Sequence, residues 1–223
     1  MVKWKNRDLR ELGIIVDTIP QIQKAKKKID IMEIVGRNGF VSIDTGAYEP
    51  FNVTIECHCL ENYNLDEIKT FLDGYGTLSF DGLRQYTAVI NNAIPIDTIL
   101  PHYKRFMVRF LVNPIAEDIT PTTMNILNEE SITIDTYSTI YPTLQITCSG
   151  DVSVTINNTT FYLDDSNGTY TLDCKNKVII DGNGNNASGI MLGDFPTFEK
   201  GSNSIYKTGT ITALTTEFRK TYL

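Results

Sequence analysis

The sequence contains little of what enzymes commonly use for catalysis. Its 223 residues include two histidines, His58 and His102, and one tryptophan, Trp4. It has no Gly-x-Ser-x-Gly nucleophile turn, no Gly-rich phosphate loop and no His-Glu-x-x-His pair. Carboxylates are numerous, but the sequence alone places no pair of them at the separation that a glycosidase needs. The sequence therefore predicts no catalytic residue, no cofactor site and no enzymatic activity.

Cysteine is also scarce, and no apolar leader precedes the first charges. Met1 is followed at once by Lys3, Trp4, Lys5 and Arg7, so we expect no signal peptide, and no apolar run is long enough to cross a membrane. In that setting we expect the cysteines to be reduced and buried, and Cys148 and Cys174 to be candidate cross-strand neighbours. The four cysteines are Cys57, Cys59, Cys148 and Cys174.

Metal ligands are not predicted either. Cys57-His58-Cys59 has metal-binding residue types, but on a strand His58 would point away from both cysteines, and no second ligand pair follows. Residues 181–186 resemble a calcium loop in composition only and are expected to form a surface turn.

Positive charge is in short supply and unevenly distributed. Lys and Arg number 20 against 27 Asp and Glu, so the net charge is −7, which argues against nucleic-acid binding. Residues 1–37 nevertheless hold 9 basic and 5 acidic residues. A basic leading segment on an acidic body suggests head-to-tail contact between subunits, or simply a solvated lysine cluster, and both interpretations stay open.

What the sequence does contain is strand patterning. In the first half, apolar and polar residues alternate over several short stretches, and the Asn-Gly pair at 38–39 indicates a turn. One helix is expected over residues 64–74, with Asn64 as its N-cap and Gly74 or Gly76 as its stop. The strands are expected at 12–16, 40–45, 51–60, 77–80, 86–91 and 106–112, with turns at 46–50 and at Asn113-Pro114. Near-continuous apolarity in the last of these strands suggests cover on both faces.

The second half consists of short strands separated by Asn- and Gly-rich turns, which is typical of a β-sandwich. Asn157-Asn158 predicts a two-residue hairpin loop, and residues 193–206 read as a closing hairpin whose Phe195, Phe198 and Ile205 pack in the core. With a linker at 119–123, we expect two domains, residues 1–125 and 126–223. The strands are expected at 131–136, 143–147, 152–156, 159–163, 169–174, 177–180, 190–192 and 209–218.

Two ordered sets of motifs resemble one protein family. The first half has Val-Gly-Arg-Asn-Gly at 35–39, Asp-Thr-Gly-Ala-Tyr at 44–48, and further segments at 66–72, 75–81 and 106–114. The second half has Tyr-Pro at 141–142, Thr-Leu-Asp-Cys at 171–174, Gly-Asp-Phe-Pro at 193–196 and Gly-Ser-Asn-Ser-Ile at 201–205. In this order they resemble the distal tail protein (Dit) family of long non-contractile-tailed phages and prophages.

The resemblance implies a mainly β fold and a structural function in the virion tail. It implies a tail-tube-like N-terminal β-domain with one α-helix, followed by an outward-facing, galectin-like or carbohydrate-module-like β-sandwich. Family members form a homohexameric ring between the tail tube and the tip or baseplate proteins. The implied partners are further copies of the chain, the tail tube protein, a tail-tip or tail-associated lysin-type protein and the tape-measure protein, without membrane or sequence-specific nucleic acid.

A carbohydrate-binding module that contacts host cell-wall saccharides is the alternative. Such modules stack sugar rings on exposed aromatic faces, and the candidate side chains are Tyr141, Tyr162, Tyr170 and Tyr206. A cell-wall hydrolase is the third class, and the missing catalytic motifs argue against it.

Overall fold

The chain folds into two compact units in the computed structural model, which describes residues 1–19, 22–36, 38–60, 63–92, 94 and 104–223. The first unit comprises Met1–Glu117 with Leu223, and the second comprises Asp118–Tyr222. The sequence placed the division at residue 125, but β10 (Thr122–Asn125) pairs with a strand of the second unit. Arg37 and His102 lie outside the described residues.

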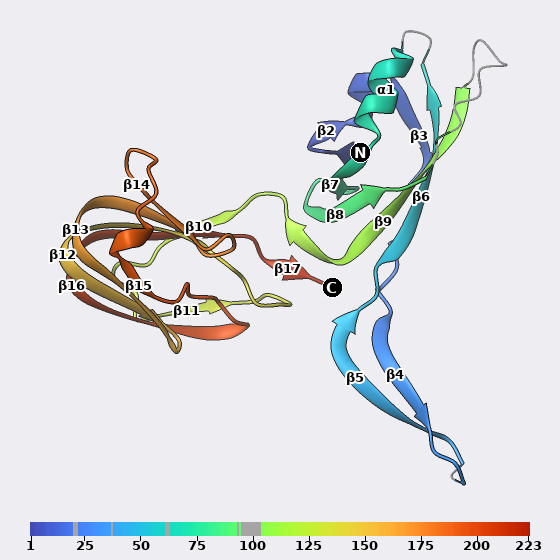
Figure 1. The fold of residues 1–223 in the computed structure, drawn as a ribbon. Coiled ribbons are helices and arrows are strands. Elements are labelled where there is room, and N and C mark those ends of the chain that lie inside the picture. The colour runs from blue at the N-terminus through green and yellow to red at the C-terminus, as the bar shows by residue number, and fades with distance from the viewer. Residues whose placement is uncertain (20–21, 37, 61–62, 93, 95–103) are drawn as a thin grey trace. The chain divides into compact units, whose positions relative to one another are not determined.

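The first unit is built on one antiparallel sheet with the strand order β2-β1-β7-β8-β9-β6-β3 (Figure 1). A short 3-10 helix (Leu9–Leu12) ends at Gly13, whose positive φ of 73° turns the chain into β3. The strands are β1 (Lys3–Trp4), β2 (Arg7–Asp8), β3 (Ile14–Thr18), β6 (Phe51–Cys59), β7 (Gly74–Ser79), β8 (Arg84–Ile90) and β9 (Lys104–Asp118).

Alternation along β6 and β9 decides which face of this sheet is buried. Val53, Ile55, Cys57 and Cys59 of β6 are buried, and the first three pair with Phe110, Val108 and Phe106 of β9, which are buried as well. The expectation that both faces of residues 106–112 are covered is wrong. Met107 is 56% exposed and Arg109 is exposed, so the face opposite the core is open.

Pro114 does not end β9 as the sequence suggested. The strand continues to Asp118. The pairing of β9 with β6 ends at Val112, opposite Phe51, so a proline two residues later removes no N–H from that ladder.

The helix α1 (Leu65–Phe71) begins where it was expected. The Asn64 side chain accepts hydrogen bonds from the backbone N–H groups of Asp66 (3.1 Å) and Glu67 (3.2 Å). Ile68 and Leu72 are buried beneath it. Gly76 is not its stop: it lies within β7, where an added Cβ would come within 3.0 Å of the Trp4 ring.

Trp4 is the largest fully buried side chain of the first unit. Its indole Nε1 donates to the carbonyl oxygen of Phe71 (3.1 Å), at the end of α1. Its ring meets Phe110 of β9 edge-on, with centroids 5.1 Å apart. One side chain thus contacts residues of both α1 and β9 from its position on β1.

Two further strands of the first unit form a separate hairpin. β4 (Lys27–Glu33) and β5 (Phe40–Tyr48) pair with each other in a two-stranded sheet of their own. Residues 46–48 were expected in a turn, but they extend β5. Gly46 has a φ of 72° at an irregularity opposite Lys27 and Ile29, so the bend is absorbed inside the strand.

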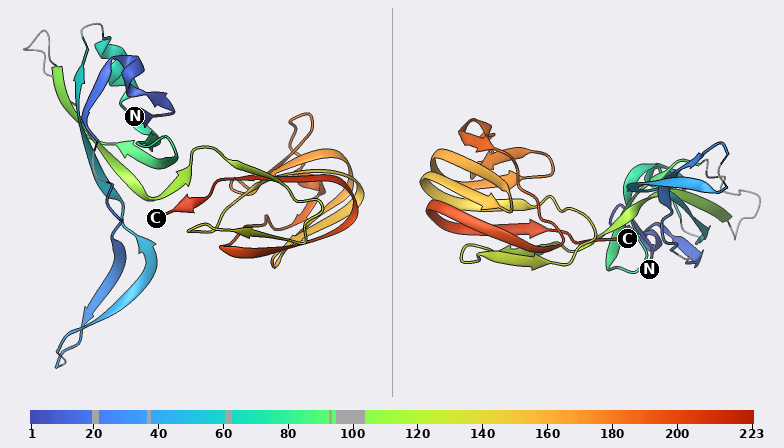
Figure 2. Two further views of the ribbon diagram at one scale, coloured as in Figure 1. Left: turned by 180° about the vertical axis from the view of Figure 1, so that it is seen from behind. Right: turned by 90° about the horizontal axis from the view of Figure 1, so that it is seen from below.

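The second unit is a single curled antiparallel sheet wrapped around one apolar core (Figures 1 and 2). Its central path runs β10-β16-β12-β13-β14, with β11 paired to β16 and β15 paired to β13. The mainly β fold is therefore confirmed. The other strands of this sheet are β11 (Ser131–Ile134), β12 (Thr143–Ile156), β13 (Thr159–Asp173), β14 (Val178–Asp181), β15 (Met191–Gly193) and β16 (Gly201–Phe218). The short β17 (Thr221–Tyr222) is not part of this sheet and pairs with β9.

Several strands expected as separate are continuous. Residues 143–156 form one strand with a register shift between Gly150 and Val152, and residues 166–168 continue β13 instead of forming a turn. Positive φ at Gly150 (76°) and Asp165 (46°) marks this irregularity. A bulge lets a long strand bend over the core without breaking its ladder. The predicted hairpin at Asn157-Asn158 is confirmed by the pairing of Ile156 with Thr159.

All four cysteines are buried and free, as expected. Burial raises the pKa of Cys57 and of Cys174 to about 12. Cys148 and Cys174 are not cross-strand neighbours as expected. Cys148 pairs with Gly168 of β13, and Cys174 follows six residues later, just after that strand ends. The Cys148 sulfur instead lies 3.1 Å from the hydroxyl of Ser166.

The stretch 193–206 does not form the hairpin expected from the sequence, because β15 pairs with β13 whereas β16 pairs with β12. The expected core positions are confirmed. Phe198 and Ile205 are in the core, and Phe195 packs against it partly buried. Gly193, with a φ of 97°, leaves no room for a side chain, since a Cβ would lie 2.4 Å from the Thr160 carbonyl oxygen. Asp181 accepts backbone N–H bonds from Asn183 and Asn185, so residues 181–186 form the expected surface turn.

Asn203 fastens this stretch to the Asn157 turn. It is fully buried, and its amide makes four hydrogen bonds. Nδ2 donates to the carbonyls of Glu199 (2.9 Å) and Gly201 (3.1 Å), while Oδ1 accepts from the Glu199 N–H (2.7 Å) and from Asn157 Nδ2 (2.8 Å). Both donors and both lone pairs are therefore used.

Asn203→Ala should destabilise the second unit by about 2 kcal/mol, because buried partners lose their hydrogen bonds. Asn203→Asp keeps the shape and the acceptors but loses both donors, so it should also destabilise the unit. The measurement is urea unfolding followed by far-UV circular dichroism, with exposed Asn176→Ala as the control. A midpoint equal to wild type for Asn203→Ala would contradict this role.

Candidate interaction surfaces

The β4–β5 hairpin, called the hairpin arm below (residues 27–48), exposes apolar side chains on both of its faces. Cross-strand pairing puts Ile29, Ile31 and Phe40 on one face, and Met32 with Ile43 on the other. The exposed fractions are large, from 45% for Ile29 to 66% for Phe40. No residue of either strand is classed as buried.

Such an arm has no core of its own. A two-stranded hairpin is marginally stable in water unless a third layer covers it. Two ion pairs support the strands: Lys27 with Asp44 inside the arm, and Lys26 with Glu49 (3.3 Å) directly beside its base. The hydrogen bond from Lys27 holds the pKa of Asp44 below its usual value. Exposed pairs of this kind contribute little, so the exposed apolar area is a surface that a partner would cover.

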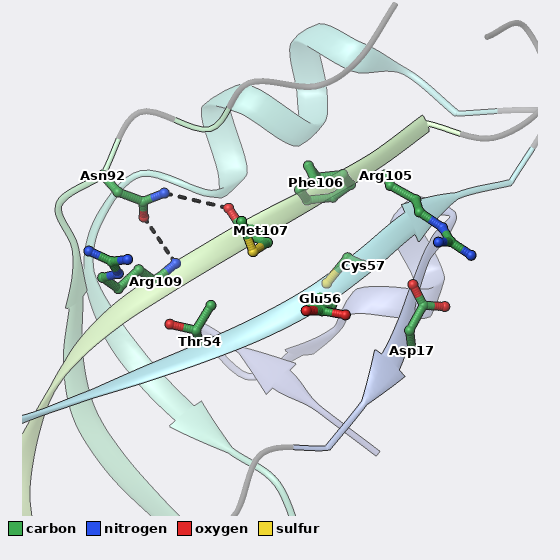
Figure 3. A pocket seen from close by; sticks show the side chains of 9 residues that line it. All are labelled: Asp17, Thr54, Glu56, Cys57, Asn92, Arg105, Phe106, Met107 and Arg109. Carbon is green, nitrogen blue, oxygen red and sulfur yellow. Dashed lines mark hydrogen bonds between the residues drawn. The ribbon is translucent and has the colours of Figure 1, made fainter.

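A groove lies on the open face of the first sheet, over β6 and β9 (Figure 3). Its volume is about 590 Å³, and its lining includes Thr54, Glu56, Arg105, Met107 and Arg109. Asn92 crosses its rim, where Nδ2 donates to the Met107 carbonyl (3.5 Å) and Oδ1 accepts from the Arg109 N–H (3.0 Å). Figure 3 shows these side chains directed outward from the two strands.

The groove is lined by side chains of both charges and by the thioether of Met107, which is not the arrangement of an acid–base catalytic site. At its border the His58 ring nitrogen Nδ1 lies 2.6 Å from Asp17 Oδ1. The one thiol in the lining is Cys57, whose raised pKa of about 12 keeps it protonated and unreactive. The groove therefore has the character of a contact surface.

The second unit presents a face that we call the tyrosine face. Ser153 of β12 pairs with Tyr162 and Thr208, and Thr155 pairs with Thr160 and Tyr206. Cross-strand partners point to the same side of a sheet, and Val152, Val154 and Ile156 between them are buried. The face therefore consists of Ser153, Thr155, Thr160, Tyr162, Tyr206 and Thr208, with Leu192 paired beside Tyr162.

The four tyrosines named from the sequence have different environments. Tyr162 (49% exposed) and Tyr206 (65%) share this face. Tyr141 is exposed but lies outside the paired strands, and Tyr170 packs against the core. The sequence therefore named the two tyrosines that the fold brings together, without a signal that separates them from the other two.

The sequence patterns over residues 21–48 did not predict the apolar arm. Its signal is present: Ile29, Ile31, Phe40 and Ile43 flank a Gly-rich turn, next to several lysines. Within the described ranges, no group of three or more His, Cys, Asp or Glu side chains is arranged to hold a metal ion. Among those same residues, no helix has the length and apolarity that crossing a membrane requires.

Comparison with known proteins identifies the fold. No protein-family model matches the sequence, and no curated protein matches it. Among solved structures, the chain is similar to the Dit (gp 19.1) protein of phage SPP1, described as a paradigm of the hub adsorption apparatus in phages that infect Gram-positive bacteria. The TM-score is 0.78 at 10% identity, over 100% of this chain and 98% of that chain. The Dit-like fold expected from the sequence is confirmed.

Proposed function

We propose that this chain is a structural hub protein of a phage tail. In this proposal it forms a homohexameric ring that joins the tail tube to the tip proteins that carry host adhesion, and it catalyses no reaction. The fold likeness to the SPP1 hub protein spans both units and supports the hub assignment. The observation that carries the ring is the hairpin arm, whose two faces both expose apolar side chains.

A ring needs two different complementary surfaces on each subunit. The arm is one such surface: it extends away from the sheet that bears it, so it is available to a neighbouring copy (Figure 1). Its exposed residues include five large apolar side chains on its two strands, so its burial yields several kcal/mol. The groove over β6 and β9 is a concave surface that a neighbour's element can enter.

The sequence suggested that a basic segment, residues 1–37, binds the acidic remainder of a neighbour. The structure gives several of these cations partners inside their own unit. Lys26 and Lys27 pair with acids of the hairpin region, and Arg7 pairs with Glu11 (3.4 Å) and Glu67 (3.0 Å). We therefore assign the main stabilisation of the ring to apolar contacts and a smaller share to charge.

The purified full chain should form six-fold rings at high protein concentration, seen by negative-stain electron microscopy and sized by sedimentation velocity. Raising the salt from about 0.1 M to about 1 M shortens the Debye length from ~10 Å to ~3 Å. Rings held by apolar contacts should survive that change, whereas rings held by charge should dissociate. A monomer at all concentrations and salt levels would contradict the ring.

The proposed partners are those of a hub: the tail tube protein on one side, and a tail-tip or tail-associated lysin-type protein and the tape-measure protein on the other. Co-expression with the tube and tip proteins of the same phage, followed by pull-down, tests these contacts separately from the ring. The proposed location is the virion tail, after assembly in the bacterial host.

A further inference from the structure

The tyrosine face has a layout that suits a sugar polymer. Tyr162 and Tyr206 lie on β13 and β16, on either side of β12. Two strand spacings and a two-residue offset along β12 separate their Cα atoms by about 12 Å. Two exposed aromatic rings thus flank a floor one strand wide, on a sheet whose other face is core.

The floor between the tyrosines is made of small hydroxyl side chains. Ser153 Oγ lies 2.7 Å from Thr208 Oγ1, and Thr155 Oγ1 lies 2.8 Å from Thr160 Oγ1. One hydroxyl hydrogen joins each pair, so each pair retains one O–H donor and free lone pairs. Such a floor pairs with the hydroxyls of a sugar ring, while the tyrosine rings stack on its C–H faces.

The charged residues around this face indicate whether a neutral or an anionic polymer would fit it. The charged residues of β12 and β13 around the floor are all acidic: Asp151, Asp164 and Asp165. Lys207 lies next to Tyr206 in sequence, but it pairs with buried Val154. Its Nζ donates to the carbonyls of Ile126 (3.0 Å) and Glu129 (2.6 Å). No cation therefore remains on the floor to bind phosphate groups.

We propose that the tyrosine face binds a neutral polysaccharide of linked pyranose rings. The two exposed rings supply stacking, the hydroxyl floor supplies hydrogen bonds, and the acidic border disfavours phosphate-rich polymers such as teichoic acids. A protein partner would favour a more apolar surface than this one, where Leu192 is the one large aliphatic side chain paired into the face. The site goes beyond the ring proposal and does not depend on it.

The test is titration calorimetry of the full chain with defined probes: dextran, a soluble β-glucan, and neutral N-acetylglucosamine oligomers, with lipoteichoic acid as the anionic comparator. Wild type should bind at least one neutral probe and should bind lipoteichoic acid less well. Tyr162→Ala with Tyr206→Ala should weaken that binding by about tenfold or more, because both stacking rings are lost.

Two further variants separate stacking from general damage. Tyr162→Phe with Tyr206→Phe keeps the rings and should retain most of the binding. Tyr75→Ala removes a tyrosine that is 78% exposed in the first unit and should change nothing. Thermal melts confirm that each variant is folded. The proposal is overturned if no neutral probe binds, if lipoteichoic acid alone binds, or if the double alanine variant binds like wild type; none of these results would affect the ring.

Discussion

Replacing Ile31 and Phe40 together with aspartate should give a folded chain that no longer assembles into rings. Both side chains lie on the same face of the hairpin arm, where they are 64% and 66% exposed. Because neither contributes to a core, the substitutions should leave the thermal melt of the first unit unchanged. Burying a side chain of this size stabilises a contact by about 1.5–3 kcal/mol, so losing both should weaken association by about 100-fold or more.

The measurement is sedimentation velocity over a range of protein concentrations, with electron microscopy of the same samples. Leu83→Asp is the matched control, since Leu83 is 73% exposed in the bend between β7 and β8, outside the arm. It introduces one aspartate in place of one comparably exposed apolar side chain, so it tests whether such a replacement outside the arm disturbs assembly. If the protein with Ile31→Asp and Phe40→Asp formed rings normally, the hypothesis that the arm lies in the subunit interface would be wrong.

Trp4→Ala should unfold the first unit at a much lower temperature than wild type while leaving the second unit's transition in place. The substitution empties a fully buried site and removes the hydrogen bond to Phe71 and the edge contact with Phe110. Removing a buried tryptophan of this kind costs about 3–5 kcal/mol. For a unit of this size, the expected drop in its melting temperature is about 10–20 °C.

Differential scanning calorimetry of the full chain tests this prediction. Because the second unit has its own core, its unfolding transition should be measurable apart from that of the first unit. Trp4→Phe is the companion variant: it keeps an aromatic ring but loses the N–H donor, so its effect should be clearly smaller. In wild type, tryptophan fluorescence reports the first unit alone, since Trp4 is the single tryptophan. An equal drop in both transitions for Trp4→Ala would contradict the independence of the two units.

Local signals in the sequence were sufficient for much of the fold. The Asn64 cap, the Asn157-Asn158 turn and the alternation in residues 51–60 each depend on neighbours within a few residues, and each is confirmed. The mainly β character follows from the density of such signals. The core positions expected for Phe198 and Ile205 are confirmed as well.

What the sequence could not show depends on pairing between distant strands. Pro114 reads as a stop, yet the pairing of β9 with β6 has already ended at Val112, opposite Phe51, so β9 continues past the proline. Residues 166–168 read as a turn, but their partners on β12 hold them in the ladder. The exposure of the apolar residues in the arm could not be predicted, because periodicity cannot reveal whether a third layer exists. For the same reason, Tyr162 and Tyr206 could not be assigned to one face before the register of β12 was known.

The hairpin arm also bears on how subunits would add to one another. In the proposed ring, an arc of fewer than six subunits would leave one arm uncovered at one end and one acceptor surface empty at the other. Each added subunit would only move that exposed apolar area to the new end, and only the sixth would remove it. The sixth subunit would form two contacts while losing the translational and rotational freedom of only one chain. Incomplete arcs should therefore be scarce, and the fraction of protein in complete rings should rise steeply with protein concentration.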